Sequence, residues 1–354
     1  MSGATGTRPS PPSIWPRPLL TALLALCVIA STGCAVRHTP LEFPTRPVAS
    51  LDSSVHARFA YAQVGSVSLT EQERDEGVVV SAGEMRVHAI GAGDAKPHLV
   101  SFEYWRARGV QRGPAILVTP ILGGGRRLAR TNCGDLARAG YHVLLAWRGT
   151  HVLDTKWTLE DLEVHFRRTI GVRRALVDWL CTRSEVDPER LGAFGISMGG
   201  LVTAALLAVE PRLKAAVIAL AGADVAGIVR VSDEGRLVRF REAKQKELGL
   251  SPAELEARMR RAFPSDPLNL IPAVDPRRVL LITTRYDPIV RPRFQTLLYE
   301  GLGRPQRYDL PTGHYTAILY LPFITKQLLI WLKSRQGPPR RLLATRATRR
   351  GRGW

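Results

Sequence analysis

The chain has 354 residues, of which 45% are hydrophobic, and its formal net charge at pH 7 is +19. This length and composition are typical of a globular protein with a large core, and they argue against a disordered or a membrane-embedded chain. The charge is unevenly spread, because the tail 337–354 holds six arginines and no acidic residue. We expect this tail to be disordered, with attraction to anionic lipid as the alternative. The chain has no nucleic-acid-binding motif, so we expect no nucleic-acid partner.

The first 33 residues are interpreted as a signal peptide. Arg8 and Arg17 precede the apolar run 19–30, which is short for a membrane span and suits the core of an export signal. Small residues then lead into Cys34, with Ser31 three positions before it. This stretch resembles a bacterial lipobox, which implies lipidation of Cys34 and an exported protein anchored to the membrane of the cell envelope. A periplasmic or secreted protein cleaved nearby, or one with an uncleaved anchor, is the alternative.

Residues 34–76 are interpreted as a tether, because their first part is rich in proline and weakly patterned. Apolar strand-like runs then alternate with helix-period segments over the predicted domain, 77–336. The predicted strands are 78–81, 85–90, 99–106, 114–121, 141–147, 191–196, 215–221, 278–284 and 306–310. The predicted helices are 128–139, 159–184, 199–209, 292–302 and 320–334. This alternation predicts an α/β fold with a mostly parallel central sheet and helices on both faces.

The stretch 222–276 interrupts the alternation. It is charged and helical in pattern, and Ser251-Pro252-Ala253-Glu254 has the form of a capping box with proline at the first helical position. We expect a helical insertion that either covers the functional site as a lid or lies to one side of it.

Two cysteines, Cys133 and Cys181, remain in the domain. We expect buried free thiols because both lie on apolar helix stripes, although an exported protein would permit a disulfide. No Cys/His spacing is typical of a metal site, so we expect no metal and no cofactor.

Ser197 lies in the sequence Gly195-Ile196-Ser197-Met198-Gly199, between an apolar strand and a helix rich in small residues. A serine on so tight a turn points its hydroxyl out of the carboxyl edge of a sheet, and flanking glycines let the chain turn without a clash. The helix that follows favours developing negative charge at its start. Ser197 is therefore the predicted nucleophile, and an ordinary glycine-rich turn is the alternative.

A serine hydroxyl needs a base to take its proton and an acid to orient that base. His314 is the histidine downstream of Ser197, and it follows the last predicted strand. Asp287 follows the strand before, so both lie where the carboxyl ends of parallel strands meet. His314 is the predicted base and Asp287 the predicted acid. Asp224, one strand earlier, is the second candidate for the acid, whereas Asp309 lies within a strand and is expected to face outward.

Acyl transfer also needs donors for an oxyanion. The backbone N–H of Met198 is one predicted donor, and the N–H of Ile121 or Leu122, after the strand 114–121, is the other. The glycines that follow, from Gly123, leave room for a substrate. A phosphate-binding loop is not expected, because no Gly-Lys-Ser/Thr follows.

The order Ser197, Asp287, His314 resembles the α/β-hydrolase superfamily, in particular serine esterases, lipases and dienelactone-hydrolase-like members. The resemblance covers roughly 78–335 and implies hydrolysis through an acyl-serine intermediate. It departs from relatives with a His-Gly-Gly-Gly oxyanion loop and from the cysteine nucleophile of dienelactone hydrolases. We expect a small-molecule or lipid-like carboxylic ester as substrate. A thioesterase, an amidase or peptidase, and a non-catalytic envelope lipoprotein are the alternatives.

Overall fold

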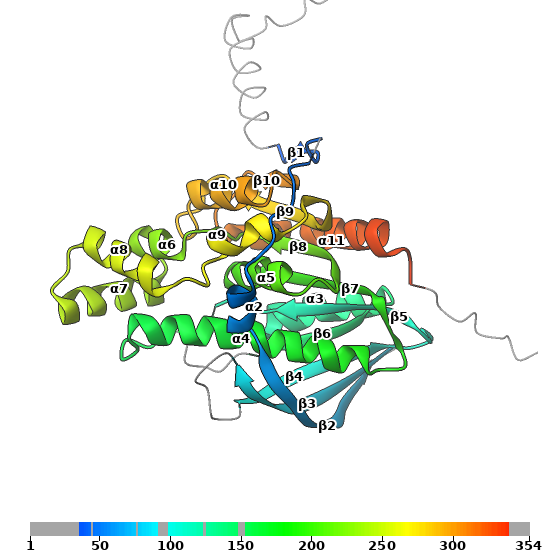
Figure 1. Cartoon of the computed structure of the whole chain (residues 1–354). Helices are drawn as coiled ribbons and strands as arrows, with labels where there is room; N and C mark the ends of the chain where they lie inside the picture. Colours follow the sequence, from blue (N-terminus) through cyan, green and yellow to red (C-terminus); the bar gives the residue numbers. More distant parts are fainter. Residues whose placement is uncertain are drawn as a thin grey trace, which may run out of the picture.

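The computed structural model describes residues 35–339, apart from Pro44, Glu76, 91–97, 123–124 and 148–152. Within these residues ten strands form one twisted sheet in the order β1-β10-β9-β8-β7-β5-β6-β4-β3-β2 (Figure 1). The strands are β1 (Arg37–Thr39), β2 (Tyr61–Asp75), β3 (Val78–Ile90), β4 (His98–Ala107), β5 (Gly113–Thr119), β6 (His142–Ala146), β7 (Val186–Ile196), β8 (Leu213–Ala219), β9 (Val279–Thr284) and β10 (Gln306–Leu310). The six strands from β10 to β6 are parallel, and β1, β2, β3 and β4 join antiparallel.

Helices cover both faces of this sheet. On one face, the helices α3 and α11 share a hydrophobic core with the strands, and on the other face α4, α5 and α10 do so. The helices are α2 (Ser53–Arg58), α3 (Arg126–Arg138), α4 (Leu159–Cys181), α5 (Met198–Val209), α6 (Val225–Val231), α7 (Gly235–Leu248), α8 (Pro252–Ala262), α9 (Pro267–Leu270), α10 (Pro292–Gly301) and α11 (Leu321–Gln336). Every residue of β5, β6 and β9 is buried, as expected for continuous apolar strands between two helical layers. The predicted fold class is confirmed.

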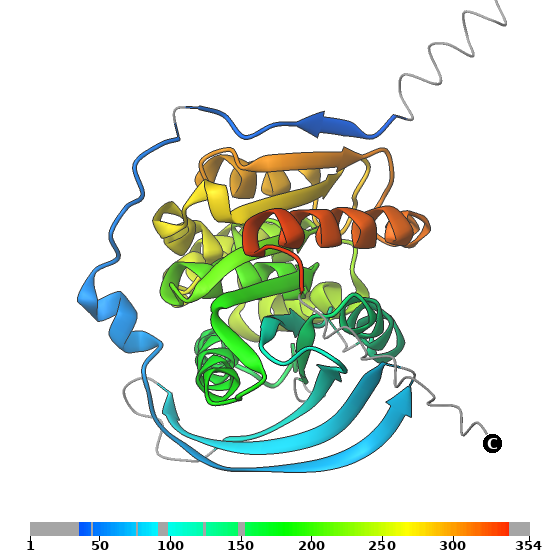
Figure 2. The ribbon, with the colours of Figure 1, turned by 90° about the vertical axis from the view of Figure 1, so that its right-hand side faces the viewer.

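The segment predicted to be a tether, 34–76, is instead part of the domain over its described residues. β1 pairs antiparallel with the edge strand β10, and β2 pairs with β3 along most of its length. Between them, the Arg46 guanidinium donates hydrogen bonds of 2.7 Å to the carbonyl oxygens of Pro272 and Gly301. Figure 2 shows this segment wrapping around the outside of the domain. The tether prediction is wrong here because proline-rich composition reveals nothing about such distant partners.

The two strands predicted over 78–90 are one strand, β3. Gly83, which lies between the two predicted strands, is against the ring of Phe102, to which a Cβ at this position would approach within 2.3 Å. The glycine therefore makes room for an aromatic side chain on the neighbouring strand and does not end the strand.

The insertion forms the helices α6 to α9, and α6, α7 and α8 project beside the sheet (Figure 1). The predicted capping box is present, with Ser251 and Glu254 each bonding the other's backbone N–H. Cys133 is buried, Cys181 is half-buried, and both are free thiols. Among the helices of the described residues, none has the length and apolar character needed to cross a membrane. The predicted signal peptide, Cys34 and residues 340–354 of the tail lie outside the described residues.

Candidate active site

Ser197 occupies a strained turn between β7 and α5. Its backbone has φ 56° and ψ −123°, a conformation that side-chain-bearing residues rarely adopt. A Cβ on Gly195 would lie 2.2 Å from the carbonyl oxygen of Gly199, and a Cβ on Gly199 would lie 2.2 Å from the carbonyl oxygen of Thr119. Both flanking positions therefore require glycine, because the backbone at this turn approaches these two carbonyl oxygens too closely to leave room for a side chain.

The structure brings the three predicted catalytic residues together. Nε2 of His314 lies 2.9 Å from Oγ of Ser197, and Nδ1 of His314 lies 2.7 Å from Oδ2 of Asp287. Each residue follows the carboxyl end of a different parallel strand, namely β7, β9 and β10. Because these ends meet at one edge of the sheet, side chains 117 positions apart in sequence become neighbours. The geometry is that of a nucleophile, a base and an orienting acid.

The carboxylate of Asp287 is almost fully buried, at 2% exposure, and each of its oxygens accepts hydrogen bonds. Oδ1 accepts from the backbone N–H groups of Ile289 and Val290, each at 2.8 Å, and Oδ2 accepts from Oγ1 of Thr284 at 2.9 Å. These donors fix the position of the carboxylate that faces the histidine.

Gln295, on α10, supports the same loop and was not predicted from the sequence. Its Oε1 accepts from the backbone N–H of Thr284 at 2.8 Å, and its Nε2 donates to the carbonyl oxygen of Val290 at 2.8 Å. The signal available in the sequence is a polar residue within the buried stripe of an amphipathic helix, between Phe294 and Leu298.

The other acids considered have different partners. Asp224 accepts from the guanidinium of Arg260 at 2.6 and 3.1 Å and from the backbone N–H of Gly227, so it links α8 to the start of α6 within the insertion. Asp309 accepts from Oγ1 of Thr283 within the sheet. Asp287 is therefore the acid that the structure places against His314.

The predicted oxyanion donors border the same cavity as Ser197. Met198 is the first residue of α5, and Ile121 and Leu122 follow β5 and line the cavity with it. The start of the loop after β5 lies directly against the turn. A Cβ on Gly199 would be 2.2 Å from the carbonyl oxygen of Thr119 and 2.9 Å from that of Pro120. Gly123 lies outside the described residues.

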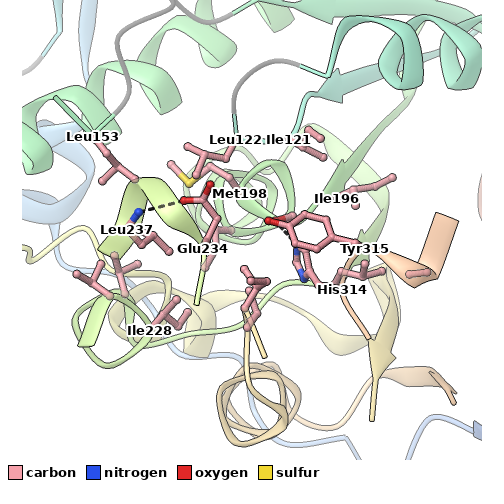
Figure 3. Close-up of a pocket in the computed structure, with 18 of the residues that line it drawn as sticks. Ile121, Leu122, Leu153, Ile196, Met198, Ile228, Glu234, Leu237, His314 and Tyr315 are labelled. Atoms are coloured by element: carbon pink, nitrogen blue, oxygen red, sulfur yellow. Dashed lines mark hydrogen bonds between the residues drawn. The ribbon is translucent and has the colours of Figure 1, made fainter. Parts of the chain in front are cut away.

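A cavity of about 270 Å³ opens onto Ser197 and His314, and its walls are almost entirely apolar (Figure 3). The insertion supplies part of the wall through Val225, Ile228, Val229, Leu237 and Phe263. The insertion therefore lies against the cavity and forms one side of its wall. Glu234 adds a carboxylate to the wall, and its Oε2 accepts from the backbone N–H groups at the start of α7.

The short 3-10 helix η3 (Thr316–Tyr320) also contributes to this cavity, with Ala317 and Ile318, and Tyr315 lies directly before it. None of these residues was predicted, because the sequence gives no signal for a short helix after the last strand. No group of three or more His, Cys, Asp or Glu side chains able to hold a metal ion occurs within the described part of the chain.

Parts of the chain are similar in sequence to known proteins. The model of the prolyl oligopeptidase family matches residues 136–307. An uncharacterized protein of Mycobacterium tuberculosis is 28% identical over 157 residues, which are 44% of this chain and 35% of that protein. The chain thus matches about a third of the length of this relative.

Among solved structures, the acetyl xylan esterase from Paenibacillus sp. R4 superposes with a TM-score of 0.58 at 16% identity, covering 79% of this chain and 91% of that one. Acetyl xylan esterase 1 from Thermoanaerobacterium sp. JW/SL YS485 gives 0.55 at 16% identity, covering 73% and 87%. A 2,6-dihydroxy-pseudo-oxynicotine hydrolase gives 0.52 at 15% identity, covering 73% and 70%. At these identities the likeness shows a shared fold.

Proposed function

We propose that this chain belongs to the α/β-hydrolase superfamily and is a serine hydrolase that cleaves carboxylic esters through an acyl-serine intermediate. The observation that carries the proposal is the continuous hydrogen-bonded series from Asp287 through His314 to Ser197, at the mouth of an apolar cavity. A non-catalytic lipoprotein would have no need for a strained serine aligned with a base.

In the proposed reaction, Oγ of Ser197 attacks the carbonyl carbon of the ester while its proton moves to Nε2 of His314. Asp287 keeps the imidazole oriented and stabilises its charged form. The oxyanion accepts from the N–H of Met198 and from that of Ile121 or Leu122. His314 then protonates the leaving alkoxide, and a water molecule deprotonated by the same imidazole releases the acid from Ser197.

The apolar cavity supports an ester with a hydrocarbon acyl group of short to medium length. An alkoxide leaves more readily than an amine, which favours esters over amides. The names of two structurally similar proteins, both acetyl xylan esterases, are in line with ester chemistry. The match to the prolyl oligopeptidase family favours an amidase or peptidase as the second candidate.

We also propose that the protein is exported and lipidated on Cys34. The support is the sequence alone: two arginines, the apolar run 19–30 and small residues before the cysteine. Radiolabelled palmitate is expected to enter the wild-type protein and to be absent from Cys34→Ala. Equal labelling of the two proteins, or a wild-type protein found in the cytoplasm, would contradict the proposal.

The substrate class is tested with p-nitrophenyl esters of increasing acyl length, the matching thioesters and the matching p-nitroanilides. Esters are expected to give the highest kcat/KM, and Ser197→Ala is expected to abolish turnover of all three series. Faster turnover of the anilides than of the esters would favour an amidase or peptidase over an esterase. No turnover of any substrate would favour the non-catalytic alternative.

A further inference from the structure

Four large apolar side chains are exposed on the two segments that carry Asp287 and His314, and two of them border the catalytic cavity. Tyr286 is 64% exposed, Tyr315 67%, Ile318 63% and Leu319 79%, and we refer to these four residues as the mouth patch. They come from two loops, after β9 and after β10, which are joined by a hydrogen bond of 3.1 Å from the backbone N–H of Tyr286 to the carbonyl oxygen of Thr312. The mouth patch is therefore one surface formed by the loops that carry Asp287 and His314.

The mouth patch is continuous with the catalytic cavity. Tyr315 and Ile318 line the cavity, and the ring of Tyr315 packs edge-on against that of His314 with centroids 5.7 Å apart (Figure 3). The other exposed large hydrophobic side chains of the described residues are spread over separate elements: Phe43, Val48, Leu69, Leu99, Leu268, Leu297 and Ile330. Single exposed apolar residues are ordinary, whereas a group around a site entrance indicates an interaction surface.

The beginning of the described chain lies beside this surface. The carbonyl oxygen of Ala35 accepts a hydrogen bond from the guanidinium of Arg285, the residue before Tyr286. β1 runs antiparallel to β10 with Arg37 opposite Asp309, so the chain enters the sheet at the edge where the strands end in catalytic loops. In the sequence, Cys34 and the apolar run 19–30 come directly before this point.

We propose that the mouth patch docks onto the surface of a lipid bilayer, so that the catalytic cavity opens toward the membrane. A membrane-attached segment leading into Ala35 would hold this face of the domain against the bilayer. The formal net charge of +19 adds attraction to anionic lipid headgroups. Docking itself does not depend on catalysis. Its consequence, entry of bilayer-dissolved esters into the cavity, rests on the proposed function.

The first test places a tryptophan in the mouth patch of the full-length chain. Leu319→Trp and the control Ile330→Trp are mixed with vesicles of phosphatidylcholine and phosphatidylglycerol in which the acyl chains carry bromine, a contact quencher. Ile330 is 51% exposed and lines a separate pocket together with Gln306, the residue at the opposite end of β10 from His314. Both variants keep residues 1–34 and the native tryptophans, so the difference between them reports on the mouth patch.

The expected result is additional quenching of Leu319→Trp, relative to wild type, and none of Ile330→Trp. Equal quenching of the two variants, or quenching of neither, would overturn the proposal. Formation of a dimer that Leu319→Ser abolishes, with no quenching by lipid, would also overturn it, because a second copy of the chain would then cover the patch.

The second test measures rates with Leu319→Ser, a change outside the cavity lining, and with Ile330→Ser as its control. Turnover of an ester embedded in the same vesicles is expected to fall roughly tenfold in Leu319→Ser, because the change removes the most exposed apolar side chain of the mouth patch from contact with the bilayer. Turnover of a soluble short ester is expected to be unchanged in both variants. An equal loss on both kinds of substrate would contradict docking. An inactive wild-type protein would count against the proposed function alone, because the quenching test needs no catalysis.

Discussion

Oδ2 of Asp287 lies 2.7 Å from Nδ1 of His314, and the same carboxylate accepts two backbone N–H groups through Oδ1. Asp287→Asn would keep the shape of the site but would favour the wrong tautomer of His314. We expect kcat on a p-nitrophenyl ester to fall roughly 10⁴-fold.

Asp224→Asn is the matched control for this change, because Asp224 follows the neighbouring strand β8 and contacts Arg260. We expect its kcat to stay within about tenfold of wild type, with some loss of stability as the insertion loosens. A larger loss of kcat in Asp224→Asn than in Asp287→Asn would show that the acid has been assigned to the wrong strand.

Gly195→Ala is expected to disrupt the turn at Ser197. The new Cβ would lie 2.2 Å from the carbonyl oxygen of Gly199, so the backbone must shift. Overpacking of this kind costs about 1–3 kcal/mol of unfolding free energy, and we expect activity to fall at least a hundredfold. Gly134→Ala, within α3, faces only the flexible end of Arg138 and should be neutral or stabilising. Urea unfolding and kcat on one ester measure both effects, and an active, stable Gly195→Ala would refute the need for glycine.

The acyl cavity is expected to set the chain length of the substrate. Ile228, on α6, lines the cavity and is buried, so Ile228→Trp should fill part of its volume of about 270 Å³. The ratio of kcat/KM for the octanoyl ester to that for the acetyl ester should fall roughly tenfold, since each excluded methylene loses about 0.8 kcal/mol of binding. Leu99→Trp, an exposed position on β4, should leave the ratio unchanged. An unchanged ratio in Ile228→Trp would place the acyl group elsewhere.

Much of this arrangement could be predicted from local patterns. The turn at Ser197 and the positions of Asp287 and His314 after strands follow from residues adjacent in sequence, and the parallel sheet brings them together. The role of residues 35–75 could not be predicted, because it depends on contacts such as Arg46 with Gly301, 255 positions away. The support that Gln295 gives to the acid loop was missed for a different reason. Its partners Thr284 and Val290 are only 11 and 5 positions away, but a polar residue in a buried helix stripe does not reveal which groups its amide binds. The position of the insertion relative to the site could not be predicted, because the segment is rich in charged residues. In the structure its apolar residues Val225, Ile228 and Phe263 line the cavity.

The stability of the fold is expected to fall in mild acid because of His142. This imidazole lies fully buried at the start of β6, and burial lowers its pKa to about 4. The unfolded chain takes up a proton near pH 6.5, so unfolding is favoured increasingly as the pH falls from about 6.5 to about 4. The wild type should lose up to roughly 3 kcal/mol more than His142→Leu over this interval. Urea unfolding at pH 7 and pH 4 measures the difference, and parallel losses in the two proteins would rule out His142 as the cause.

The proposed hydrolysis requires that Ser197 is a nucleophile activated by His314. The most direct measurement is reaction with a fluorophosphonate, followed by mass spectrometry of the labelled peptides. We expect one phosphonylated residue, Ser197, with labelling that is lost in Ser197→Ala and at least a hundredfold slower in His314→Ala. Labelling that persists at full rate in Ser197→Ala, or a wild-type protein that does not react, would contradict it.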